Sequence, residues 1–194
     1  MSNIRYAAIV RNADKAILAR WGGPEYADKI SELIGSPAFS SKVSTGQRMR
    51  VNTESESFNF CGDEQGLAVI VVSSSAYPER IVFPGLIEDL RSKFLSKYAG
   101  QWSTVSPDGL TKKFMSEMKK ACTEYEDLAS KDKIQRLQSQ VDTVTSTMRD
   151  NIGKALENLE STERLEEMSA GLVNSADRFK KDSKKLMWKV SSQP

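Results

Sequence analysis

The 194-residue chain contains no histidine, and this absence excludes several kinds of catalytic and metal site. Neither a Ser-His-Asp triad nor a Cys-His pair can form, and His-containing zinc sites and His-based pH switches are excluded as well. The two cysteines, Cys61 and Cys122, are far apart and lack a Cys-x-x-Cys spacing. They indicate neither a metal site nor a disulfide framework, so we expect two buried, free thiols in a reducing compartment.

Long apolar runs are also missing. The longest, Leu67–Val72, is far shorter than the ~20 residues that span a bilayer. No basic region followed by an apolar run begins the chain, so no targeting segment is predicted there. The chain has 28 Lys and Arg residues and 26 Asp and Glu residues, so its net charge is +2. A charge this small does not by itself predict nucleic-acid binding. The sequence has no recognisable acid-base pair and no glycine-rich phosphate loop. We therefore expect that the protein is not an enzyme and that it binds neither a cofactor nor a metal ion.

The first 126 residues mix strand and helix patterns. Two short apolar runs, Ile4–Val10 and Lys15–Trp21, flank the turn-forming Asn12–Asp14 and predict a hairpin. A helix is expected to begin at Pro24 and to end at Gly35, before Ser36-Pro37.

A polar stretch follows, and then three more strands. Gln47–Thr53 and Ser57–Cys61 read as the first two, and Leu67–Val72 is the third after a Gly-bounded turn. Because Leu67–Val72 has no polar alternation, we expect it at the centre of the sheet with both faces covered.

Two helices complete this part of the chain. One is expected from Pro78 to Leu95, although Pro84 lies inside its apolar pattern and favours a start near residue 84. The other begins at Pro107-Asp108-Gly109 and runs to Tyr125. The order β-β-α-β-β-β-α-α predicts an α+β domain, in which helices flank a five-stranded antiparallel sheet.

From residue 134 onward the pattern is helical only, with a 3.5-residue repeat that is typical of a coiled-coil strand. Eleven of sixteen seam positions are apolar and three more are Ser or Thr. The positions are Ile134, Leu137, Val141, Val144, Met148, Asn151, Ala155, Asn158, Thr162, Leu165, Ser169, Leu172, Ala176, Phe179, Ser183 and Leu186. Alone in water this stripe has nothing to pack against, so we expect it to be partly disordered or held by another surface.

Two features of the seam favour a bundle of several helices over a permanent homomeric coiled coil. Its small side chains suit a crowded bundle, and two polar residues, Asn151 and Asn158, lie near its middle. A buried polar seam residue costs stability but specifies register and partner number.

The seam runs into a basic end. Arg178–Lys189 contains a single acid, Asp182. Its membrane-proximal residues are expected to be Lys180, Lys181, Lys184, Lys185, Trp188 and Lys189. Lysines attract anionic headgroups and tryptophan favours the membrane interface, so this end is predicted to lie at a bilayer, with an ordinary solvated helix end as the alternative.

Together these features resemble a longin-domain SNARE of the synaptobrevin class over essentially the whole chain. Ser75–Phe83 and Leu86–Leu90 are similar to the longin strand-to-helix junction, most closely that of the ER–Golgi member. Met148–Ile152 resembles the segment in which that member has Asn-Ile-Glu, with Gly153 in place of the acid. The resemblance implies a longin (profilin-like) domain at 1–126, a linker at 127–133, a SNARE motif at 134–189 and a tail at 190–194.

The resemblance also implies a mechanism and partners. One such strand joins three strands from syntaxin-like and other Q-SNAREs in a parallel four-helix bundle that drives membrane fusion, while the longin domain regulates the strand or binds coat and tether proteins. It implies the cytosolic face of endomembranes (ER, Golgi, vesicles or endosomes) and a membrane anchor after Pro194. A non-fusogenic sorting adaptor and a structural coiled-coil scaffold are the alternatives.

The central layer departs from the family pattern. This class normally carries an arginine there, but the register places Asn158 at that position. Registers centred on Arg149 or Arg164 are rejected because they bring charged residues or glycine into the seam. Asparagine can hydrogen-bond to the partners' glutamines but brings no charge, so a weaker central lock is expected.

The longin domain of such proteins also holds its own strand in a closed form. Asn151, Ile152, Leu156 and Leu159 form a second apolar line beside the seam and are candidates for this fold-back. Additional contacts within the bundle are the alternative role. Slow amide exchange over residues 148 to 160 in the free protein is the corresponding prediction.

Overall fold

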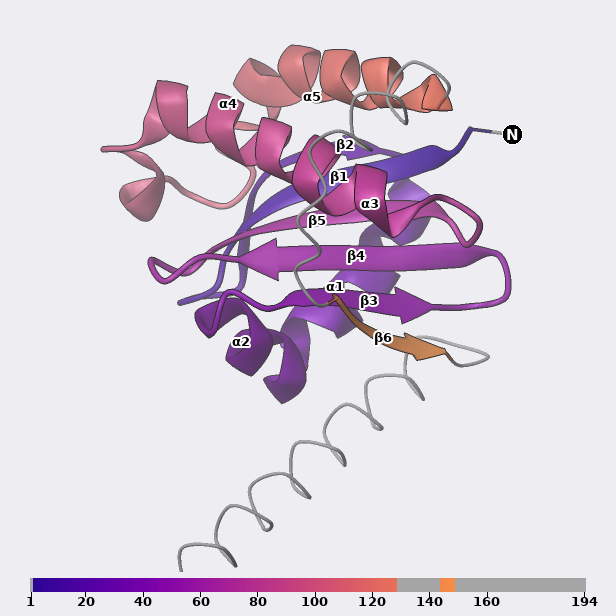
Figure 1. Cartoon of the computed structure of the whole chain (residues 1–194). Helices are drawn as coiled ribbons and strands as arrows, with labels where there is room; N and C mark the ends of the chain where they lie inside the picture. The colour runs from indigo at the N-terminus through magenta and orange to yellow at the C-terminus, as the bar shows by residue number, and fades with distance from the viewer. Residues whose placement is uncertain (1, 129–143, 149–194) are drawn as a thin grey trace, which may run out of the picture. The chain divides into compact units, whose positions relative to one another are not determined.

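A mixed sheet with helices on both faces forms the folded domain (Figure 1). The computed structural model describes residues 2–128 and, for its backbone only, residues 144–148. The strands are β1 (Ile4–Arg11), β2 (Ala16–Gly22), β3 (Arg48–Asn52), β4 (Glu56–Gly62), β5 (Leu67–Ser74) and β6 (Val144–Met148), and they lie in the order β2-β1-β5-β4-β3-β6.

The first five strands pair in an antiparallel manner, as predicted. β5 occupies the middle of these five, and its residues Leu67–Ser73 are all buried. This position explains the unbroken apolar run, because a central strand has both faces covered. The sixth strand pairs in parallel with β3 and was not expected.

Helices cover the two faces of the sheet unequally. One face is covered by α1 (Ala27–Gly35), which follows the short 3-10 turn Pro24–Tyr26, and by α2 (Pro37–Ser44). The other face is covered by a longer helical layer. It consists of α3 (Glu79–Ile81), the π-helical segment Val82–Ile87, α4 (Glu88–Tyr98), the 3-10 turn Trp102–Thr104 and α5 (Thr111–Glu126).

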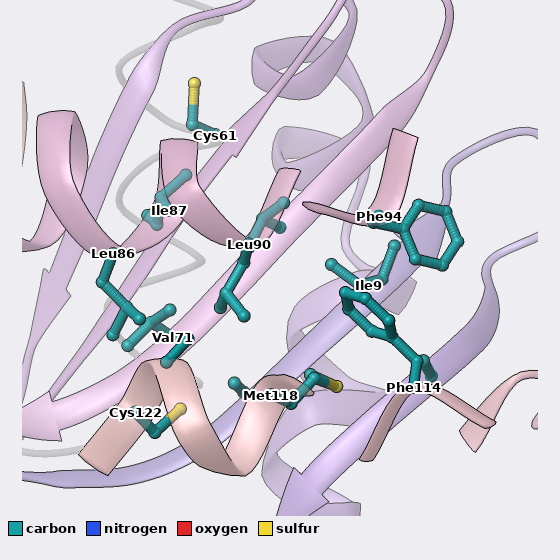
Figure 2. Packing of buried hydrophobic residues seen from close by; sticks show 14 of the residues in the cluster. Ile9, Cys61, Val71, Leu86, Ile87, Leu90, Phe94, Phe114, Met118 and Cys122 are labelled. Atoms are coloured by element: carbon teal, nitrogen blue, oxygen red, sulfur yellow. The ribbon is translucent and has the colours of Figure 1, made fainter. Parts of the chain in front are cut away.

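The larger core lies between the sheet and this second layer. Side chains of α4 and α5 converge on one face of β1 and β5, as Figure 2 shows for Leu90, Met118 and Val71. Phe94 and Phe114 meet edge to face with ring centroids 5.3 Å apart, which joins the two helices over the sheet. Cys61 and Cys122 are free and buried, as predicted, and burial raises the pKa of the Cys122 thiol.

The polar stretch after Gly35 contains a helix, α2, that the sequence analysis left unassigned. Its local signals are clear in the structure. Ser36 caps the helix, since its Oγ accepts a hydrogen bond from the Phe39 backbone N–H at 3.1 Å, and Pro37 occupies the first helical position. The short apolar set was hidden by three serines, but Ala38, Phe39 and Val43 are all buried against the sheet.

Pro84 does not mark the start of a helix. The helical layer begins at Glu79 and continues through Pro84 in the π-helical segment Val82–Ile87. A proline has no N–H to donate and its ring crowds the preceding turn, and the wider π turn relieves both problems without ending the helix. The prediction of a start near residue 84 was therefore wrong.

Candidate interaction site at the edge of the sheet

β3 is one of the two edges of the five-stranded antiparallel sheet, and residues 144–148 of the chain pair with it. The register matches Arg48 with Val144 and Asn52 with Met148, so the whole of β3 is covered (Figure 1). An unpaired edge strand presents a row of free backbone N–H and C=O groups. Strand addition satisfies these groups without any requirement for a particular side chain.

β3 is held firmly because its side chains alternate between two buried environments. Met49 and Val51 lie opposite Phe60 and Phe58 of β4 and are completely buried. These pairs share the face on which α2 contributes Phe39, whose ring centroid is 5.0 Å from that of Phe60. Arg50 points to the opposite face and is 3% exposed.

Arg50 connects the edge strand to the strand-to-helix junction that carried the family resemblance. Its guanidinium donates to the carbonyl oxygens of Ser75 and Tyr77 and to Ser57 Oγ, each at 2.9 Å. Glu79 lies 3.6 Å from Arg50 Nε. Burial lowers the pKa of Arg50, while the nearby Glu79 carboxylate opposes this shift. A buried cation with this many acceptors fixes β3 relative to α3.

The junction itself is tied to α5. The Tyr77 hydroxyl donates to the carbonyl oxygen of Tyr125 at 2.7 Å, and burial raises its pKa. A chain of contacts thus runs from the β3 edge through Arg50 and Tyr77 to the last turn of α5. The edge that receives β6 is therefore part of the rigid domain.

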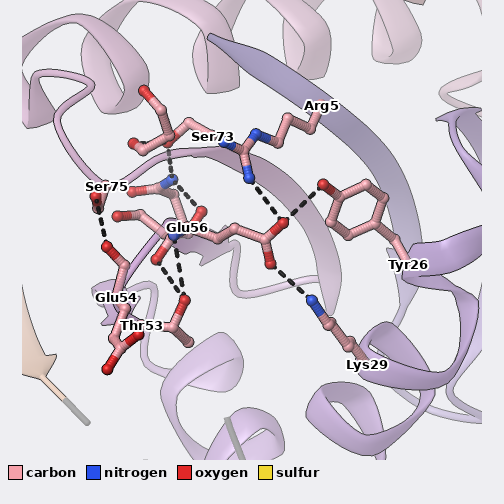
Figure 3. A network of polar contacts seen from close by, with 11 residues as sticks. Arg5, Tyr26, Lys29, Thr53, Glu54, Glu56, Ser73 and Ser75 are labelled. Atoms are coloured by element: carbon pink, nitrogen blue, oxygen red, sulfur yellow. Dashed lines mark hydrogen bonds and ion pairs between the residues drawn. The ribbon is translucent and has the colours of Figure 1, made fainter. Parts of the chain in front are cut away.

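A second polar cluster stabilises the start of β4, next to β3. Figure 3 shows three side chains converging on the Glu56 carboxylate. Arg5 and the Tyr26 hydroxyl donate to Oε1, both at 2.8 Å, and Lys29 donates to Oε2 at 2.7 Å. Burial alone would raise the pKa of Glu56, but these hydrogen bonds hold it below its usual value. The cluster joins β1, the Pro24–Tyr26 turn and α1 at one point.

Residues 144–148 were expected to be helical, and in this structure they are a strand. The segment Val-Thr-Ser-Thr-Met contains three β-branched residues, which favour an extended backbone. This local preference was a usable signal that the seven-residue repeat obscured. The strand contains the predicted seam positions Val144 and Met148.

The remaining predicted interaction residues lie outside the described residues. These are the seam positions Ile134, Leu137, Val141 and Asn151 to Leu186, the central Asn158, the fold-back candidates Asn151, Ile152, Leu156 and Leu159, and the basic end Lys180–Lys189. Where the structure does describe the chain, no group of three or more Cys, Asp or Glu is arranged to hold a metal ion. Within the same residues, no helix is both long and apolar enough to cross a bilayer.

Comparison with protein families finds a match in each of two separate parts of the chain. Residues 30–118 match the family model described as a Regulated-SNARE-like domain, Longin. Residues 133–193 match the Synaptobrevin family model.

The chain is similar in sequence to known synaptobrevin homologues and vesicle-associated membrane proteins. Synaptobrevin homolog YKT6 of Candida glabrata is 24% identical, covering 74% of this chain and 70% of that protein. Putative vesicle-associated membrane protein 726 of Arabidopsis thaliana is 26% identical, covering 76% and 67%. Synaptobrevin-A of Dictyostelium discoideum is 39% identical, but over 29% of this chain and 62% of that protein.

The fold and these matches define a longin domain followed by a synaptobrevin-type segment. The chain belongs to the longin-domain SNAREs of the synaptobrevin class, which serve in vesicle transport. Membership of this family implies SNARE partners in a complex and supports the expectation that the chain is not an enzyme.

Proposed function

We propose that this chain supplies one helix of a parallel four-helix fusion bundle, and that its longin domain holds part of that helix as a strand until partners arrive. The observation that carries the proposal is the pairing of residues 144–148 with β3. The same five residues include two predicted seam positions, Val144 and Met148. Residues 144–148 would therefore take part in two different structures, the sheet of the longin domain and the proposed helical bundle.

The two structures exclude each other on geometric grounds. A helix rises ~1.5 Å per residue and a strand ~3.3 Å, so residues 144–148 cannot serve β3 and the bundle at once. Bundle assembly would have to remove β6 from β3. The longin domain therefore opposes assembly by the free energy of this pairing, and partner strands overcome it.

The gross driving force of the bundle is large by comparison. At ~25 cal/mol per Å² of apolar surface removed from water, sixteen layers of the predicted kind amount to tens of kcal/mol. A short parallel strand on one sheet edge contributes far less. The pairing would delay assembly and would not prevent it.

The proposed partners and location follow from the family. The partners would be syntaxin-like and other Q-SNAREs on the opposing membrane, with coat or tether proteins bound by the folded domain. Similarity to a YKT6 protein and to vesicle-associated membrane proteins supports the cytosolic face of endomembranes, with transport between ER and Golgi as the specific step proposed. The division into 1–126, 127–133, 134–189 and 190–194 is part of this proposal.

The proposed bundle has an uncharged centre. Asn158 would face the glutamines of its partners with one hydrogen-bonding amide in place of an arginine. Charge-assisted hydrogen bonds are roughly twice as strong as neutral ones, so the central layer would be weaker than in an arginine-containing bundle.

The test mixes the chain with the purified SNARE strands of a syntaxin-like set. Helix content and thermal melting are followed by circular dichroism, with Asn158→Arg measured beside the unchanged chain. A large gain of helix and a cooperative high-temperature transition, shifted upward in Asn158→Arg, is the expected result. An unshifted transition would contradict the weak-centre proposal alone.

The second candidate function is a sorting adaptor that does not fuse membranes. The atypical centre at Asn158 is the observation that favours it. Absence of any helix gain with each cognate set tested, while the longin domain still unfolds cooperatively, would reject the fusion proposal in favour of this adaptor.

A further inference from the structure

The outer face of α5 carries a group of lysines that form no ion pair with other described residues of the domain. Phe114, Met118, Ala121, Cys122 and Tyr125 bury the inner face of this helix. The opposite face is exposed and carries two Lys-Lys pairs, 112–113 and 119–120, with Met115 and Ser116 between them. Because seven residues are close to two helical turns, the second pair lies on the same face as the first.

The four lysines have no partner inside the described part of the chain. Lys97 of α4, by contrast, forms an ion pair with Glu117. Glu126 accepts hydrogen bonds from the backbone N–H groups of Asn3 and Ile4, so its carboxylate is engaged as well. Glu124 remains as the acid at the far end of this face. The first three turns of α5 therefore present an uncompensated positive charge.

An apolar side chain lies at the edge of this charge. Met115 is 43% exposed and is the only large apolar side chain that is well exposed among the described residues. It is three residues from Lys112 and four from Lys119, so it is a surface neighbour of both. Exposed apolar groups bordered by lysines are the pattern of helices that lie on anionic membranes.

We infer that the α5 face formed by Lys112, Lys113, Met115, Lys119 and Lys120 is a contact surface for an anionic lipid bilayer. The lysines supply diffuse electrostatic attraction, and Met115 enters the interfacial region. Lysine is a compact, flexible charge and does not form the bidentate pairs with which arginine selects phosphorylated or acidic peptides. An all-lysine face with one methionine therefore fits a charged plane better than a specific acidic segment.

The position of α5 in the fold gives this contact a consequence. α5 packs over β1 and β2, at the opposite side of the sheet from β3 and β6 (Figure 1). A bilayer bound to α5 would leave the β3 edge accessible. The inference goes beyond the proposed function and does not depend on bundle formation.

The test measures binding of the full chain to phosphatidylcholine vesicles with and without phosphatidylserine, by flotation at low and high salt. Because the basic end of the chain is also expected to bind lipid, every protein carries Lys180→Gln, Lys181→Gln, Lys184→Gln and Lys185→Gln. Into this background we introduce Lys112→Gln, Lys113→Gln, Lys119→Gln and Lys120→Gln together. The matched control replaces the same four α5 lysines by arginine, which keeps the charge.

The background protein should bind anionic vesicles in a salt-dependent manner. Each membrane-bound lysine is worth about fivefold in partitioning, so the α5 glutamine variant should bind at least tenfold more weakly, whereas the arginine control should not. Met115→Ser should weaken binding further in high salt, where the apolar contribution remains. All five substituted positions in α5 are exposed, so the variants should stay folded, and circular dichroism checks this.

Two results would overturn the inference. One is equal vesicle binding by the background protein and its α5 glutamine variant. The other is absence of vesicle binding together with charge-dependent capture of an acidic peptide by the same lysines, which would assign the face to a protein partner. Bundle assembly is measured without lipid, so failure here leaves the proposed function untouched.

Discussion

Gly62 ends β4 at the point where this strand passes closest to α2. A Cβ added at Gly62 would lie 2.5 Å from the carbonyl oxygen and 2.8 Å from the Cα of Val43. Because these are backbone atoms, neither can move away cheaply. We expect Gly62→Ala to lower the free energy of unfolding by about 2 kcal/mol, measured by urea denaturation.

The matched control is Gly35→Ala. Apart from the adjoining residues and the backbone of α1 itself, no atom of the residues that the structure describes lies within 4 Å of an added Cβ at Gly35, at the end of α1. That substitution should leave stability unchanged or raise it slightly, because alanine favours a helix over glycine. Equal losses in both variants would contradict the account of a tight β4–α2 approach.

Glu56 gives the domain a predictable dependence on pH. Its carboxylate has a lower pKa in the folded state than in the unfolded chain, where 4.5 applies. Its contribution is therefore complete above the unfolded value and is lost as the pH falls through the folded value. Glu56→Gln should lower the free energy of unfolding at pH 7 by about 2 kcal/mol and by much less in acid.

Urea denaturation at pH 7 and at acidic pH checks this prediction. Glu64→Gln is the control, because Glu64 is exposed on a turn. An equal loss of stability for Glu56→Gln at both pH values would show that the hydrogen-bond geometry matters and the charge does not.

At the scale of elements, β6 is the segment that the proposed function requires in two conformations, the strand seen here and a helix in the bundle. Thr145, Ser146 and Thr147 form the middle of the strand but occupy none of the predicted seam positions. Their joint replacement by alanine should weaken the strand and favour the helix without changing the bundle seam. We expect faster exchange of the β3 amides and several-fold faster assembly with partner strands.

The control for this variant carries alanine at Ser139, Ser161 and Ser175, which lie outside both β6 and the predicted seam. It raises helix propensity to a similar degree but leaves the strand sequence intact. If both variants accelerate assembly equally, pairing of β6 with β3 does not restrain the helix.

Most elements of the domain could be predicted from sequence, because local pattern and tertiary environment agree there. The β5 run is apolar throughout because both its faces are covered, and the hairpin of β1 and β2 follows from its turn residues. The exceptions were α2, Pro84 and β6. For α2, the polar composition outweighed the helix cap at Ser36 and the apolar Phe39. For Pro84, the expectation that proline begins a helix failed because a π-helical segment accommodates it. For β6, the seven-residue repeat outweighed the β-branched residues that favour a strand.

The site at the β3 edge could be predicted only in part. Fold-back of the SNARE motif was expected from the family resemblance, but at residues 148 to 160 and through side chains. The structure places a backbone pairing at residues 144–148. Strand addition depends on main-chain groups, which leave little trace in the pattern of apolar residues, so β-branched content was the only cue in the sequence.

At the scale of the whole molecule, two surfaces of one domain are assigned to two tasks. The β3 edge, anchored by Arg50, receives residues 144–148, and the outer face of α5 is inferred to contact lipid. Because the sheet separates them, the two contacts do not compete for space. Membrane attachment and restraint of the SNARE motif should therefore be separable by mutation.

The measurement that tests the central claim most directly is hydrogen exchange on the full chain, before and after the partner SNARE strands are added. Slow exchange is predicted at β3 and at residues 144–148 in the free chain. After mixing, the β3 edge should lose protection while residues 144–148 stay protected as helix. Fast exchange of residues 144–148 in the free chain, or an unchanged β3 edge after assembly, would contradict the account.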